Sequence, residues 1–75
     1  MPKLVQFGNI KIYVFANDHS PPHFHVVSAE FEAMVSFDTF EVIRGRISRR
    51  ALEAARGWAR ENMEVLQREW ARLNG

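Results

Sequence analysis

The chain contains no cysteine among its 75 residues. This absence excludes a disulfide framework and a thiolate metal site, and nothing ties the chain to an oxidising compartment. Long apolar runs are also absent, so no window predicts a membrane-spanning helix. The N-terminus lacks the apolar stretch and small-residue cleavage site of a signal peptide. We therefore expect a cytoplasmic protein that does not span a membrane.

An excess of one charge is lacking too, because ten Lys and Arg nearly balance nine Asp and Glu and leave a net charge of +1. The total neither favours nor excludes nucleic acid, so the distribution of charge must decide. Hydrophobic residues make up 47% of the chain and include six Phe and two Trp. This composition predicts one small globular domain over residues 1–75, with marginal stability that self-association would increase.

Apolar and polar residues alternate from residue 3 to residue 44, and this period predicts β-strands. The segments LVQF, KIYVF, HFHVV, FEAMVSFD and EVI give four to five short strands. Turn signals at Gly8–Asn9 and at Asp38–Thr39 separate the first strand from the second and the last strand from its predecessor. An antiparallel meander sheet over residues 3–44 follows from this pattern.

Helical spacing replaces the alternation after residue 44. Ser48 is a suitable N-cap, and apolar residues spaced by three or four predict one long amphipathic helix over residues 48–73. Trp70 lies in the apolar stripe and Trp58 lies at its edge, so both are expected to pack. The predicted fold is α+β, with the helix packed on one face of the meander sheet.

One helix covers one face of a sheet, so the other face of a monomer should be polar. The predicted second face instead mixes apolar side chains with imidazoles, a composition typical of contact surfaces. Its members are Tyr13, Phe15, His23, His25, Val27 and Met34. We expect a second copy of the chain, forming a homodimer, or a different protein to bind there. The alternative is that loops or the first strand cover this face internally.

All three histidines, His19, His23 and His25, lie in the segment NDHSPPHFHV. In the HxH pattern on a strand, both imidazoles leave the same face about 6–7 Å apart. Together with His19 they can be ligands of a divalent transition metal such as zinc, iron or nickel. Three residues are candidates to add an oxygen ligand: Asp18, Glu30 and Asp38.

Two other interpretations of the histidines compete with the metal site. A pair of imidazoles can act as general acid and general base, which phosphodiester cleavage at neutral pH requires. Alternatively, His23 and His25 are half-buried strand residues that donate hydrogen bonds to carbonyls and carboxylates. We favour this structural interpretation, in which no cofactor is expected.

The segment RGRISRR concentrates Arg44, Arg46, Arg49 and Arg50 at the predicted start of the helix. Helix N-termini attract anions, and the arginine fork suits phosphate, so the cluster is a candidate site for phosphate or nucleic acid. With the histidines it gives an alternative function, a small endoribonuclease or metal-dependent hydrolase. Equally, nearby carboxylates can pair with these charges and leave an ordinary solvated loop. Those carboxylates are Glu41, Glu53 and Glu61.

The segments DHSPPHFHV and EFEAMVSFD, followed by the helix ending LQREW, resemble the small bacterial and archaeal family known as domain of unknown function 4160. The resemblance covers nearly the whole chain. The residues that carry it are Met1, Pro2, Asp18, His19, Pro21, Pro22, His23, His25, Glu30, Phe31, Glu32, Ala33, Ala51, Leu52, Trp58, Leu66 and Trp70. The chain departs from the family pattern at Thr39 and Phe40, where a Gly is common, and at Arg44, where the family has an acidic residue.

The resemblance implies little about activity, since the family is defined by its unknown function. Its members are often encoded beside another small family, domain of unknown function 2442, in arrangements similar to toxin–antitoxin pairs. A partner protein from that second family is therefore implied. Because the basic cluster looks peculiar to this chain, the resemblance gives no support to a family-wide RNA site. The expected function is a protein-interaction module that resembles one component of such a pair.

Overall fold

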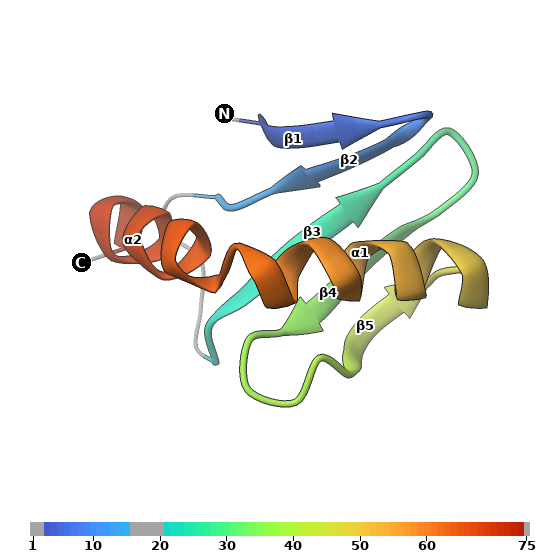
Figure 1. Cartoon of the computed structure of the whole chain (residues 1–75). Coiled ribbons are helices and arrows are strands. Elements are labelled where there is room, and N and C mark those ends of the chain that lie inside the picture. The colour runs from blue at the N-terminus through green and yellow to red at the C-terminus, as the bar shows by residue number, and fades with distance from the viewer. Residues whose placement is uncertain (1–2, 16–20, 75) are drawn as a thin grey trace.

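The computed structural model describes residues 3–15 and 21–74, which form a sheet followed by two helices (Figure 1). Within these ranges, five antiparallel strands lie in chain order across the sheet, so each strand pairs with the next. The elements are β1 (Lys3–Phe7), β2 (Ile10–Tyr13), β3 (His23–Val27), β4 (Glu32–Ser36), β5 (Val42–Arg46), α1 (Arg49–Glu61) and α2 (Met63–Asn74). The predicted α+β meander is confirmed.

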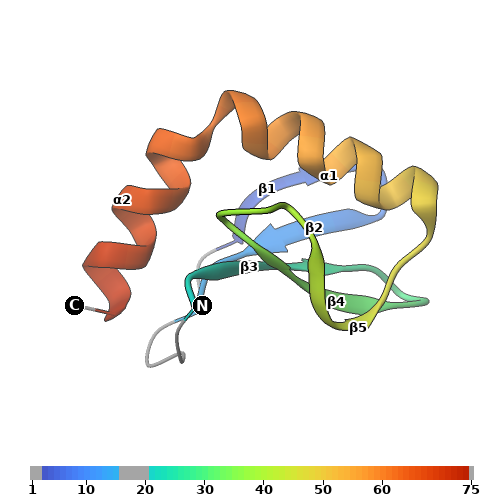
Figure 2. The same ribbon diagram turned by 90° about the horizontal axis from the view of Figure 1, so that it is seen from below.

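The core forms where the apolar side of the sheet meets α1, and Figure 2 shows α1 lying along that face of the sheet. Every second residue of the central strands contributes a buried apolar side chain, which is the consequence of the alternation in the sequence: Ile12, Val14, Phe24, Val26, Ala33 and Val35. The buried face of α1 consists of alanines, whose small side chains allow the helix to approach the sheet closely. The main core residues are Ile12, Val14, Phe24, Val26, Val35, Phe37, Ala55, Ala59 and Leu66.

The prediction of one continuous helix over residues 48–73 is wrong, because Asn62 interrupts the helix and divides it into α1 and α2. This residue has φ −129° and ψ 26°, which lie outside the helical range. Its backbone N–H donates to the Ala59 carbonyl, and its Nδ2 donates to the Trp58 carbonyl at 2.8 Å. The side chain of Asn62 thus satisfies an orphan carbonyl at the end of α1. The break turns α2 down past the end of the sheet (Figure 2).

The helix begins as predicted. The Ser48 Oγ accepts a hydrogen bond from the Ala51 N–H at 3.2 Å, which is the expected N-cap geometry. No helix within the described ranges is long and apolar enough to cross a membrane.

The sheet extends beyond its predicted limit at residue 44, because β5 continues to Arg46. Arg46 pairs with Glu32, and Gly45 pairs with Ala33. The two strands approach so closely that a Cβ on Gly45 would overlap the Glu32 carbonyl oxygen and lie 2.9 Å from the Ala33 Cα. The prediction ended the strand too early because an Arg-Gly-Arg segment has no apolar alternation.

The turn between β4 and β5 contains Phe40, which has a positive φ of 59° although it is not a glycine. Its N–H donates to the Ser36 carbonyl at 3.0 Å, and its carbonyl accepts from Arg56 Nε at 2.8 Å. The Arg60 guanidinium also lies 5.7 Å from the centre of the Phe40 ring. Two arginines of α1 therefore hold this turn against the helix.

Candidate interaction surface

The face of the sheet opposite α1 carries two rows of side chains that run across all five strands. Directly paired residues of an antiparallel sheet share a face, so the register defines both rows. The first row is Lys3, Tyr13, His25, Met34 and Arg44. The second row is Gln6, Lys11, Val27, Glu32 and Arg46. We call these ten residues the open face, because no helix in the described ranges covers them (Figure 2).

Exposure varies along the open face in a regular way. Its rim is exposed and charged or polar, as seen at Lys3 and Arg44. Its centre is partly exposed and mainly apolar, with Tyr13, Val27 and Met34 half-buried. The predicted interaction residues of the three central strands are thus brought together on one surface. An apolar centre inside a polar rim is the usual anatomy of a protein interface.

His25 lies in the middle of the open face but offers little surface, since it is only 8% exposed. The Phe15 ring meets it edge-on with ring centres 4.4 Å apart. Its Nδ1 lies 3.7 Å from Glu32 Oε2, a contact that becomes an ion pair when the imidazole is protonated. Tyr13 in turn stacks on Phe15 at 5.5 Å.

His23 lies at the start of β3 and is 2% exposed. Its Nδ1 donates to the Pro21 carbonyl at 2.8 Å, since a carbonyl can only accept. Its ring lies 5.0 Å from His25 and 5.3 Å from Trp70 of α2. The two histidines therefore connect the open face to the helix that closes the end of the sheet. They are more deeply buried than the sequence predicted.

Two members of the predicted histidine and carboxylate metal site, Asp18 and His19, lie outside the described residues. Among the residues that the structure describes, no three histidine or carboxylate side chains gather in a way that would hold a metal ion. Glu30 precedes β4 and Asp38 follows it, so these two candidate oxygen ligands lie at opposite ends of that strand.

The arginine cluster is divided between two elements. Arg44 and Arg46 belong to β5 and lie on the open face, whereas Arg49 and Arg50 begin α1. All four are exposed. Glu53, one of the predicted partners of this cluster, instead pairs with Arg56 at 2.8 Å. Only half of the cluster therefore lies at the helix N-terminus, where the sequence placed all of it.

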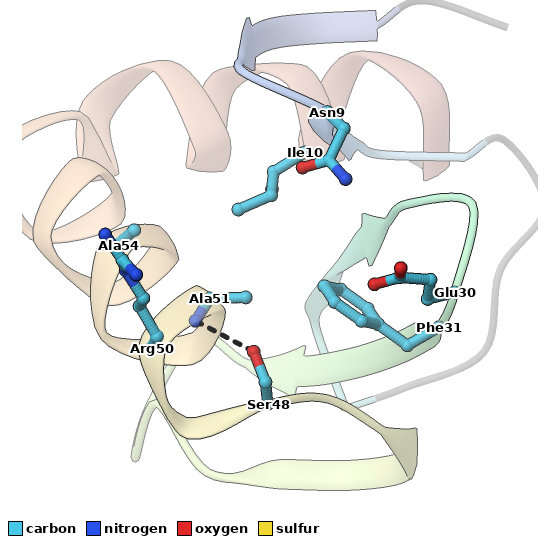
Figure 3. A pocket seen from close by; sticks show the side chains of 8 residues that line it. All are labelled: Asn9, Ile10, Glu30, Phe31, Ser48, Arg50, Ala51 and Ala54. Carbon is cyan, nitrogen blue, oxygen red and sulfur yellow. Dashed lines mark hydrogen bonds between the residues drawn. The ribbon is translucent and has the colours of Figure 1, made fainter.

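A recess that sequence reasoning missed lies on the other side of the sheet, where the turns before β2 and β4 approach the start of α1 (Figure 3). Figure 3 shows Phe31, Ile10 and Ala51 pointing into it. Its volume is about 270 Å³, and a neighbouring recess shares Glu30, Phe31 and Ser48. The sequence signal that could have found the recess is a Phe directly after Glu30, at the start of the predicted strand that faces the core. Its lining combines these apolar side chains with polar and charged ones: Asn9, Glu30, Ser48 and Arg50.

Comparison with curated proteins found no match, and comparison with solved structures found none either. Comparison with protein families found one match, to the family described as domain of unknown function (DUF4160), over residues 9–71. These residues include the PPHFH segment, all of β3, β4 and β5, and most of α2. The chain therefore belongs to the domain of unknown function 4160 family.

Proposed function

We propose that this chain is a small protein-interaction domain that binds another protein through the open face. The observation that carries the proposal is the half-buried apolar centre of this face, formed by Tyr13, Val27 and Met34 on three adjacent strands. Apolar side chains at the centre of an uncovered sheet gain free energy when a partner removes them from water. No helix in the described ranges supplies that cover.

The edges of the sheet favour docking onto the face over addition of a strand. Both edge strands are irregular, with register shifts between Lys3 and Val5 in β1 and between Met34 and Val35 where β4 pairs with β5. Ile43, which is 44% exposed, lies at the second irregularity. Bulges and charged residues on edge strands hinder pairing with another strand. A partner therefore has better access to the centre of the open face.

The catalytic alternative receives less support from the geometry. A general acid or base must reach its substrate, yet His23 and His25 are buried and packed against aromatic rings. The hydrogen bond from His23 to Pro21 and the contact of His25 with Glu32 instead resemble structural roles. The separation of Arg44 and Arg46 from Arg49 and Arg50 also weakens a single phosphate site. We therefore favour binding over catalysis.

The first candidate partner is a protein of the domain of unknown function 2442 family, as the family resemblance implies. In this proposal the two proteins form a toxin–antitoxin-like pair. Self-association through the same face is the other candidate, and its test is the oligomeric state. Both candidates place the partner over the same three side chains, so one set of variants examines both.

The experiment is co-expression of the chain with the product of the gene next to it, followed by affinity capture and sedimentation of the purified complex. Val27→Asp and Met34→Asp place a carboxylate in the centre of the open face. Ala71→Asp places the same group on an exposed position of α2 and is the matched control. Urea denaturation of each variant establishes that it folds.

We expect the wild type and the Ala71→Asp variant to form a stable complex, and the two open-face variants to lose most of it. A buried unpaired carboxylate in an interface is strongly unfavourable. Capture that is unaffected by Val27→Asp and Met34→Asp would contradict the proposal. So would a strict monomer that recovers no partner.

A further inference from the structure

The open face is positively charged in a chain that is nearly neutral. It carries four cations and, in Glu32, a single anion, so its net charge is +3 when His25 is neutral. Since the whole chain has a net charge of +1, all other residues together carry −2. The cations are Lys3, Lys11, Arg44 and Arg46. The charge of this domain is thus unevenly distributed between its surfaces.

From this distribution we infer that the partner presents an acidic protein surface, with carboxylates around an apolar centre. The inference rests on the proposed function and names the chemistry of the partner. Lys3 and Arg44 end the first row. In the second row Lys11 lies beside Val27 and Arg46 lies at the far end, so cations lie on both sides of the apolar centre. In the described ranges neither Arg44 nor Arg46 forms an ion pair. Carboxylates of a partner would complement them.

A second copy of the chain does not fit this face well. A two-fold dimer places the same patch of both subunits together, so the open face would meet another net charge of +3. Glu32 can offset only one of these cations, and its carboxylate already lies 3.7 Å from His25. Like charges brought together across an interface disfavour the complex. The charge therefore favours a different protein over self-association.

Nucleic acid also fits less well than an acidic protein. Binding of single strands depends on exposed aromatic rings on which bases stack. The ring of Tyr13 already stacks on Phe15, with the two planes inclined by 11°. The remaining centre is Val27 and Met34, which have no aromatic surface. Arg49 and Arg50, the other half of the basic cluster, lie in α1 and away from the open face.

A fluorescein-labelled acidic peptide of Asp, Glu and Leu residues is the first probe, measured by fluorescence anisotropy at several salt concentrations. An oligouridylate of the same net charge is the second probe. The test variant is Lys11→Glu with Arg44→Glu, which reverses two cations of the open face. The control variant is Arg49→Glu with Arg68→Glu, which reverses two exposed cations of the helices and gives the same net charge.

We expect the wild type to bind the acidic peptide with an affinity that falls as salt rises. The open-face variant should bind on the order of tenfold more weakly, whereas the control variant should change far less. Equal weakening by both variants would overturn the inference, because it would show a response to total charge alone. Tighter binding of the oligouridylate than of the peptide would overturn it in favour of nucleic acid.

The lysines provide a direct readout of the contact, since Lys3 and Lys11 are the only two in the chain. Carbodiimide joins a carboxylate to a lysine amine as an amide, and the water removed converts the carbodiimide to a urea. Mass spectrometry of the coupled peptide should place the new amide at Lys11 or Lys3. Coupling confined to the N-terminal amine would overturn the inference.

The outcomes separate this inference from the proposed function. If the peptide does not bind but capture of the partner still depends on Val27 and Met34, the acidic partner is wrong and the interaction function stands. If capture is unaffected by those two residues, the proposed function itself fails. If peptide binding and coupling both map to the open face, the acidic-partner inference is supported.

Discussion

The rings of His23 and Trp70 lie 5.3 Å apart, at a tilt of 59°, and join the first residue of β3 to the middle of α2. Trp70 also meets Phe37 at 5.9 Å, and Phe37 meets Phe24 in the core at 6.1 Å. Ring contacts therefore run from the open face through His25 and His23 around the end of the sheet to the core. Trp70 is the residue of α2 that links the histidine rings to the phenylalanine rings of the core.

Trp70→Ala should lower the free energy of unfolding by about 3 kcal/mol, the lower end for truncation of a large aromatic residue, because the side chain is partly buried. Urea denaturation followed by circular dichroism measures the change. Gln67→Ala alters an exposed position of the same helix and should stay within about 0.5 kcal/mol of the wild type. Equal effects of the two substitutions would refute the role given to Trp70.

Gly45→Ala and Gly57→Ala should have opposite effects on stability. A Cβ on Gly45 would meet the backbone of Glu32 and Ala33, and the φ of Gly45 is 89°, so we expect destabilisation of at least about 2 kcal/mol. Apart from its chain neighbours and the backbone of its own helix, nothing lies within 4 Å of the Cβ position of Gly57, in the middle of α1. Alanine there should stabilise the fold by roughly 0.5–1 kcal/mol. Thermal unfolding of both variants tests the pair, and a stable Gly45→Ala protein would contradict the close strand approach.

Phe40 adopts a backbone conformation that glycine tolerates better than other residues. Phe40→Ala and Phe40→Gly both remove the ring and its contact with Arg60, so their difference reports the backbone alone. We expect the glycine variant to be more stable than the alanine variant by about 1 kcal/mol. Denaturation of the two variants under identical conditions gives the difference. If alanine proves as stable as glycine, the positive φ carries no strain.

The pKa of Glu69 lies below its ordinary value, mainly because Arg72 donates a hydrogen bond to the Glu69 carboxylate at 2.7 Å. A lowered folded-state pKa means that this contact stabilises the fold at neutral pH. The stabilisation is lost as pH falls from the ordinary value of 4.5 through the lowered value. Glu69→Gln should therefore lose less stability than the wild type when pH drops from neutral into this range. Urea denaturation at a series of pH values measures the free energy of unfolding of both proteins. An equal loss of stability in the two proteins between neutral and acidic pH would argue against the contact.

The sheet was predictable from sequence because each strand buries one face. Alternation identified the core positions of β2, β3 and β4, and the Ser48 cap located the start of α1. The two errors have a common cause. The helix propensity of Asn62 does not predict that α1 ends there. The lack of apolar alternation in Arg44–Arg46 does not predict that β5 continues through it. In both places tertiary contacts decide the outcome.

The sequence predicts which residues share the open face but not how deeply the histidines among them are buried. Period-two spacing placed Tyr13, His25 and Met34 on one face, and the register confirms this. Burial of the imidazoles depends on Phe15 and Trp70, which approach from other parts of the chain. The positive φ of Phe40 could not be predicted, because glycine adopts this conformation far more readily than a bulky side chain does.

The placement of both lysines on the open face decides how this protein should be handled in binding assays. Reagents that acylate lysine amines remove positive charge from this surface and add bulk to it. Coupling the chain to a sensor matrix through these amines would turn the open face toward the matrix and hide it from proteins in solution. Attachment through a C-terminal tag, beyond α2, leaves that face directed at the analyte.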